Sequence, residues 1–127
     1  MATLTKTLTL TSSDVLSDTL SVSLTKDVTV AGNVKMQQIT TSNSATEIAA
    51  MTDDVGRSIV YMKNLDTAID IKIFTDADNG NDAAADEQIM DIKPGEFALF
   101  PWAGIQALYV QSDSGTPVLE FGLFAIA

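Results

Sequence analysis

Apolar and polar residues alternate along the first third of this chain, and this pattern restricts its local structure more than any other feature. From Thr3 to Thr11 every odd position is threonine, and every even position is leucine except Lys6. A second run keeps the same parity, with apolar residues at Leu20, Val22, Leu24, Val28 and Val30. A period of two gives an extended strand one apolar and one polar face, and β-branched threonine favours that backbone. Both runs therefore predict half-buried β-strands.

The rest of the chain predicts further short strands with turns between them. Glycine and asparagine within residues 31–33 predict a turn, and residues 34–41 predict the next strand. Residues 44–51 fit either a strand or a short helical segment, since Ser44 and Glu47 have the spacing of a capping box. The later strands are expected at residues 57–63, 68–75, 88–92, 97–100, 107–111 and 118–125.

About nine strands joined by turns, with at most one short helix, predict an all-β fold, an antiparallel, jelly-roll-like β-sandwich. The length of 127 residues favours one domain, residues 1–127. Every aromatic residue lies beyond residue 60, so the core is expected within residues 57–127. Residues 1–34 either complete this sandwich or form an N-terminal strand arm shared with a neighbouring subunit. Deleting residues 1–12 should leave a folded core in the second case and prevent folding in the first.

The chain contains no histidine and no cysteine, which removes the residues of most familiar catalytic and metal sites. A Ser-His-Asp triad, a cysteine nucleophile, a disulfide and a zinc site of thiolates or imidazoles are therefore excluded. Glu47, Glu96 and Glu120 are isolated carboxylates, with no visible pairing for acid–base catalysis. We expect a non-enzymatic protein without a cofactor, and we assign no catalytic, cofactor-binding or metal-ligating residue.

Acidic residues outnumber basic ones by 17 to 7, which gives a formal net charge of −10. This charge argues against a nucleic-acid partner, because phosphates would be repelled. The first residues lack the apolar segment of a signal peptide, and no apolar run reaches the roughly 18 residues of a membrane span. The acids from Asp76 to Asp82 could offer oxygen ligands to calcium, although their spacing departs from an EF-hand. A solvated acidic loop is the alternative.

Phe100 and Trp102 are the candidate interaction surface. An exposed aromatic side chain at either position could stack on a sugar or anchor a protein partner. Because Pro101 limits ladder pairing, Trp102 is expected just past the end of a strand. The alternative is that both aromatic side chains close one end of the sandwich.

Several short motifs follow one another in the second half of the chain in a recognisable order and spacing. They are IVYMKNLD at 59–66, IKIF at 71–74, IKPGEFALFP at 92–101, LYVQSD at 108–113 and VLEF at 118–121. Their order resembles the small β-sandwich virion structural proteins of tailed bacteriophages, in which a KNLD-like turn precedes a PGE turn and a final LEF or LEY strand. The resemblance covers residues 57–127 and does not extend to the threonine-rich beginning of the chain.

This resemblance implies a non-enzymatic virion component, in particular a capsid decoration or cement protein that binds and stabilises the capsid lattice. Its expected partners are further copies of itself and the major capsid protein or another virion protein, and it would assemble in the cytoplasm of a bacterial host. The alternatives are a structural protein of the tail, neck or fibre, and a carbohydrate-binding β-sandwich module. The matching positions look structural, so the resemblance carries no functional residue to this chain.

Overall fold

The computed structural model describes residues 2–14, 17–50, 57–76 and 88–127. In these ranges the chain forms strands and no helix. The strands are β1 (Ala2–Ser12), β2 (Leu20–Thr40), β3 (Thr46–Ala49), β4 (Ser58–Asn64), β5 (Ile71–Asp76), β6 (Gln88–Ile92), β7 (Phe97–Trp102), β8 (Ala107–Ser112) and β9 (Val118–Ile126). The all-β prediction is thereby confirmed.

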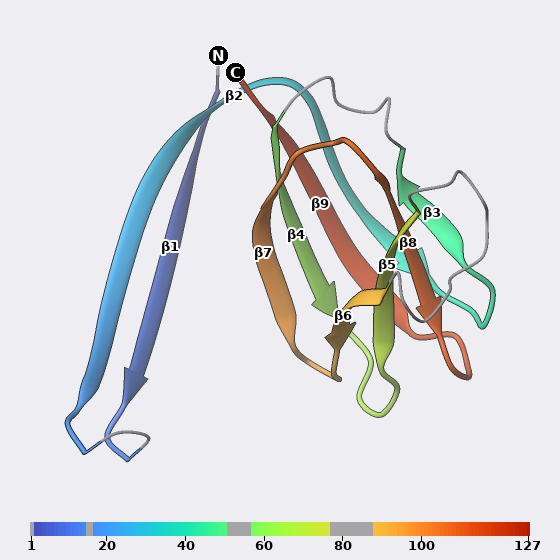
Figure 1. Cartoon of the computed structure of the whole chain (residues 1–127), viewed down its shortest axis with the longest axis horizontal. Coiled ribbons are helices and arrows are strands. Elements are labelled where there is room, and N and C mark those ends of the chain that lie inside the picture. Colours follow the sequence, from blue (N-terminus) through green and yellow to red (C-terminus); the bar gives the residue numbers. More distant parts are fainter. Residues whose placement is uncertain (1, 15–16, 51–56, 77–87) are drawn as a thin grey trace.

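Two antiparallel sheets pack together as a β-sandwich (Figure 1). The larger sheet has the order β1-β2-β9-β4-β7, and the smaller has the order β3-β8-β5-β6. The pairs β2–β9, β3–β8, β4–β7 and β5–β6 are nested within one another along the chain. This is the pattern of one long hairpin rolled up so that its strands alternate between two sheets, which is the jelly-roll arrangement.

The core lies between the two sheets and is built from alternate residues of each strand. Val60 and Met62 of β4 and Leu119, Phe121 and Leu123 of β9 point inward from the large sheet, with at most 1% of each side chain exposed. The small sheet contributes the side chains that face them, chiefly Ile71, Ile73, Ile92, Leu108 and Val110. Burial of such apolar surface is the main force holding the two layers together.

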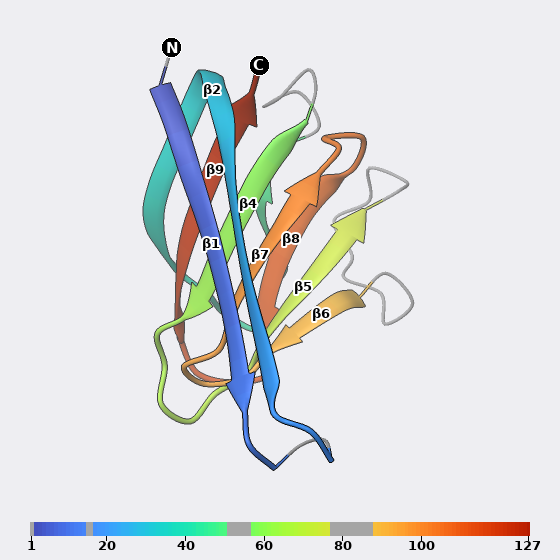
Figure 2. The same cartoon turned by 90° about the vertical axis from the view of Figure 1, so that its left-hand side faces the viewer.

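The first part of the chain forms an arm, defined here as β1 with residues 20–30 of β2. The two strands pair without a break from Ala2 opposite Val30 to Ser12 opposite Leu20. The arm stands beside the sandwich at the left of Figure 1 and crosses the front of the large sheet in Figure 2. The sandwich body, residues 34–127, begins where β2 changes partner from β1 to β9.

The structure contradicts one sequence prediction in this region and decides between the alternatives of another. The turn expected at residues 31–33 is wrong, because β2 runs through these residues and only shifts its register between Val30 and Val34. A strand can absorb such a shift as a bulge without turning back. The ambiguous segment 44–51 contains a strand, β3, in its described part, and Met51 lies outside the described residues.

Two of the motifs on which the resemblance rests, IVYMKNLD and IKPGEFALFP, meet through the buried Asn64. Its amide nitrogen Nδ2 donates to the carbonyl oxygens of Ile69 at 2.8 Å and Ile92 at 2.9 Å, so it joins segments of both sheets. Its backbone N–H donates to the carbonyl of Glu96 at 3.0 Å, and its carbonyl accepts from the N–H of Gly95 at 3.1 Å. The KNLD turn and the PGE turn are therefore docked on each other.

Local hydrogen bonds explain where β5 starts. The Asp66 carboxylate accepts from the backbone N–H groups of Ala68 at 2.8 Å and Ile69 at 2.9 Å. These bonds hold the pKa of Asp66 below its ordinary value. They also tie the chain at residues 68 and 69 to Asp66, and the strand begins at Ile71 rather than at the predicted residue 68.

Candidate interaction surface

The outward face of the large sheet is unusually apolar. The cross-strand register places Pro101, Ile59, Phe124 and Val34 in one row across β7, β4, β9 and β2. The next row contains Leu99, Tyr61, Gly122 and Met36, and Phe97 lies beyond it on β7. Phe97 is 64% exposed, Met36 54%, Val34 52% and Leu99 45%. We call this set the outer sheet face.

The arm has its own largely apolar face, made by the even-numbered residues of both strands, among which Lys6 and Lys26 lie opposite each other. Leu4 pairs with Val28, Leu8 with Leu24, and Leu10 with Val22. This face is only partly covered, since Leu24 is 61% exposed, Leu10 47% and Leu8 41%. The odd-numbered residues form a polar face of threonine, serine and aspartate, as the alternation predicted.

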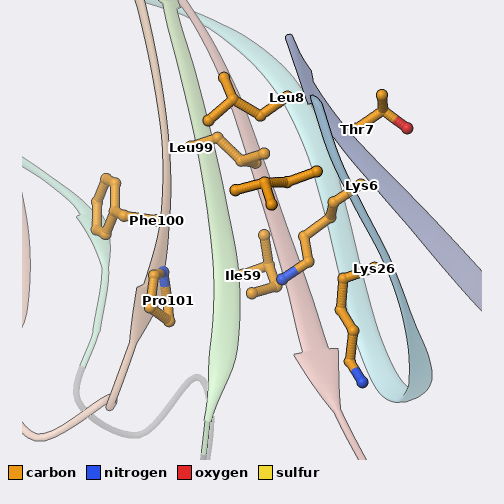
Figure 3. A pocket seen from close by; sticks show the side chains of 9 residues that line it. Lys6, Thr7, Leu8, Lys26, Ile59, Leu99, Phe100 and Pro101 are labelled. Atoms are coloured by element: carbon orange, nitrogen blue, oxygen red, sulfur yellow. The ribbon is translucent and has the colours of Figure 1, made fainter. Parts of the chain in front are cut away.

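A groove separates the apolar face of the arm from the outer sheet face (Figure 3). It has a volume of about 190 Å³. Leu8 and Leu24 line it from the arm, and Ile59 and Leu99 from the sheet. Lys6 extends across the groove towards Ile59, whose side chain is 1% exposed. The arm therefore shelters part of the outer sheet face and leaves apolar side chains on both walls in contact with solvent.

The row that contains Phe97 is otherwise polar, with Lys63, Glu120 and Gln38 on the neighbouring strands. Tyr61 donates a hydrogen bond from its hydroxyl group to Oε1 of Glu120 at 2.8 Å. The pKa of Tyr61 is raised, first because burial disfavours the phenolate and then because Glu120 accepts its proton in a hydrogen bond. Glu120 thus lies on the outward face of β9, between the buried Leu119 and Phe121, and a tyrosine of the neighbouring strand β4 holds its carboxylate.

Phe100 and Trp102 lie on the inward face of β7. Trp102 is 8% exposed and belongs to the core, and it is the last residue of β7 rather than a residue beyond it. Phe100 is half-buried and packs against the same core. Pro101 does not end the strand, because β7 is an edge of the large sheet and has β4 as its only partner there.

The exposed side chains of this segment are instead Phe97 and Leu99, which are not among the predicted interaction residues. The signal that could have identified them is parity. If the alternation of β7 is continued through Pro101, the two aromatic residues Phe100 and Trp102 fall on one face, and Phe97 and Leu99 fall on the other.

The isolated carboxylates have structural partners. Glu47 accepts a hydrogen bond from the Tyr109 hydroxyl group at 3.1 Å, and Glu96 accepts one from the backbone N–H of Lys93 at 3.0 Å. Within the described residues, no group of three or more acidic side chains is arranged to hold a metal ion. Most of the candidate calcium loop from Asp76 to Asp82 lies outside those residues, because residues 77–87 are not described.

Comparisons with protein-family models, curated proteins and solved structures found no match to this chain. The described part of the chain contains no helix with the length and hydropathy of a transmembrane segment.

Proposed function

We propose that this chain is a non-enzymatic structural protein that acts by binding protein surfaces, and that it decorates or cements the capsid of a tailed bacteriophage. The observation that carries the proposal is the pair of exposed apolar walls formed by the arm and the outer sheet face. Leu24 and Phe97 are each more than 60% exposed. Large exposed apolar surfaces usually mark sites where a protein meets a partner.

The chemistry of these walls supports a protein partner. Leucine and isoleucine side chains of the arm and the sheet line them, and Lys6 and Lys26 of the arm add positive charge to the groove. An apolar patch bordered by polar or charged groups is the usual arrangement of a protein–protein interface. Trp102 is buried in the core, so the observation that would have favoured a sugar-stacking site is lacking.

The capsid assignment is supported by the resemblance of residues 57–127 to phage virion proteins and by the jelly-roll arrangement. Jelly rolls occur in viral capsid domains as well as in lectins, so the fold is compatible with this function without establishing it. A capsid decoration protein must be soluble alone and adhesive on the shell. The net charge of −10 would supply the first property, and the two apolar walls would supply the second.

The proposal is tested by incubating the purified chain with capsid shells of the phage that encodes it. The wild-type chain should co-sediment with the shells and raise their melting temperature. Leu24 and Leu99 would become buried against the shell in the complex. Burying a leucine side chain contributes about 1.5–3 kcal/mol, and Leu24→Ser or Leu99→Ser removes this contribution. Each variant should therefore bind at least tenfold more weakly.

Ile89→Ser is the matched control. Ile89 lies on β6 of the small sheet and is 49% exposed, close to the 45% of Leu99. This variant should bind as the wild-type chain does. The proposal is overturned if the wild-type chain does not bind shells, or if Ile89→Ser weakens binding as much as Leu99→Ser does.

A further inference from the structure

Within the described residues, the two sheets have four edge strands, and one of them differs from the others. β3 has 4 residues and β6 has 5, and each shifts its register against its neighbour. β7 has 6 residues and contains Pro101. Short length, bulges and proline are the usual features that prevent an edge strand from pairing with another chain.

β1 has none of these features. It has 11 residues without proline, and its register with β2 is continuous. It is the last strand in its sheet, so within the described residues its other side is an unpaired edge. Lys6 is its single charged side chain. A long, regular edge strand of this kind is a template for another strand.

The sequence of β1 is also complementary to itself. When two copies are aligned antiparallel with Thr7 opposite Thr7, Thr3 faces Thr11 of the second copy, and Thr5 faces Thr9. On the other face, Leu4 meets Leu10 and Lys6 meets Leu8. Every threonine thus meets a threonine, and no lysine lies directly opposite another.

The neighbouring registers are poorer. If Lys6, instead of Thr7, lies opposite its own copy, two lysines face each other directly. Like charges in that position are destabilising. Placing Leu8 opposite its own copy shortens the ladder, because Ala2 and Thr3 then have no partner residue in β1 of the second copy. A shift that places odd residues opposite even ones would mix the threonine face with the leucine face.

We propose that a second copy of this chain pairs with it through β1. This proposal rests on the proposed function of a structural protein that acts by binding protein surfaces. The two β1 strands run antiparallel about a two-fold axis at Thr7 and join the two large sheets into one. The pairing makes the apolar faces of both arms continuous, because their even-numbered residues lie on the same side. Only three of the 17 acidic residues (Asp14, Asp18 and Asp27) lie in the first 30 residues, beside two lysines, so the overall charge opposes this contact little.

Disulfide trapping tests the proposal, because the chain has no cysteine of its own. In Thr7→Cys the two Cβ atoms would lie about 4.5–5.5 Å apart, near the separation at which disulfides form. Mild oxidation at low protein concentration should convert most of this variant to a covalent dimer. Mixing Thr3→Cys with Thr11→Cys should give a mixed dimer.

Two variants serve as controls. Thr25 pairs with Thr7 inside the same arm, so in Thr25→Cys the thiols of two copies would be three strand spacings apart, about 14 Å. In Thr3→Cys alone the thiols would be about 27 Å apart along the ladder. Neither control should form a dimer above the background of random collision.

The proposal is overturned if Thr7→Cys forms dimers no faster than Thr25→Cys, or if Lys6→Cys or Leu8→Cys is trapped faster than Thr7→Cys. Shell binding of the uncross-linked chain is measured in parallel. Loss of trapping with intact shell binding refutes the β1 pairing alone. Trapping without shell binding refutes the capsid function and leaves the pairing established.

Discussion

The arm and the sandwich body are both built from alternating strands, yet their apolar faces lie in different environments. In the body, Leu119 and Phe121 alternate with Glu120 and are fully buried beneath the second sheet. In the arm, Leu8 and Leu24 face each other across two strands and remain 41% and 61% exposed. A hairpin of two strands has no second layer of its own, and such hairpins are marginally stable alone. We therefore expect the body to supply most of the folding free energy, while the arm leaves apolar surface exposed to solvent.

The sharpest test of this difference compares one apolar side chain from each region. Phe121→Ala should lower the free energy of unfolding by about 3–5 kcal/mol, because it leaves a cavity between the sheets. Leu24→Ala should change it by less than about 1 kcal/mol in dilute solution. Urea unfolding followed by the fluorescence of Trp102, the single tryptophan, measures both. Equal losses would show that the arm is part of the folding core.

The body also depends on a buried polar group, for which the arm has no counterpart. Asn64→Ala leaves the carbonyl oxygens of Ile69 and Ile92 without their donor. We expect the free energy of unfolding to fall by about 2–3 kcal/mol, since each unsatisfied buried group costs about 1–3 kcal/mol. Asn43→Ala, at an exposed position, is the control and should stay within about 0.5 kcal/mol. If the same urea experiment shows an equally small fall in unfolding free energy for both variants, Asn64 does not have this stabilising role.

Deleting the arm should have a smaller effect on stability. The cut belongs after residue 30, because residues 34–40 of β2 pair with β9 inside the body. The truncated chain should still fold. Its free energy of unfolding should fall by about 1–2 kcal/mol, chiefly because Ile59 becomes exposed. Circular dichroism and the emission maximum of Trp102 would report an intact body. An unfolded product would mean that the arm is required for the fold.

The smallest effect is expected from the turn that contains Asp66. Its pKa in the folded chain lies below the ordinary 3.8, so its ionised form stabilises the fold at higher pH. This contribution is present above pH 3.8 and is lost as the pH falls through the lower, folded-state pKa. The stability difference between the wild-type chain and Asp66→Asn, measured by urea unfolding, should therefore narrow as the pH is lowered below 3.8. A difference that is independent of pH would contradict this role.

Alternation predicted most of the strands, and the turns at Asn64, Gly95 and Gly115 were recognisable from their residues. Gly95 has the positive φ of 78° expected after Pro94, and Glu96 N–H donates to the Lys93 carbonyl at 2.9 Å to close that turn. Glycine and asparagine within residues 31–33 favour a turn locally. At that point β2 instead exchanges one partner strand for another, and this depends on β9, which is far away in the sequence.

The candidate surface was less predictable than the fold. Phe100 and Trp102 were chosen because large aromatic residues next to a proline stand out in the sequence. Whether a side chain on an edge strand points to the core or to solvent depends on the phase of the alternation and on which face the second sheet covers. Because proline limits ladder pairing, the sequence alone did not show that the alternation of β7 continues through Pro101. Phe97 and Leu99 were therefore not predicted as exposed residues.

By itself, the sequence of this protein determined that its chain forms two-faced strands and which residues share a face, because the period of two is a property of neighbouring residues. It also excluded the side chains of most catalytic sites. Only the tertiary structure decided that β2 to β9 pair in nested order and that one apolar face is buried while another remains exposed. Any alternating strand can pair with any other, so the choice depends on how the whole chain closes around one core.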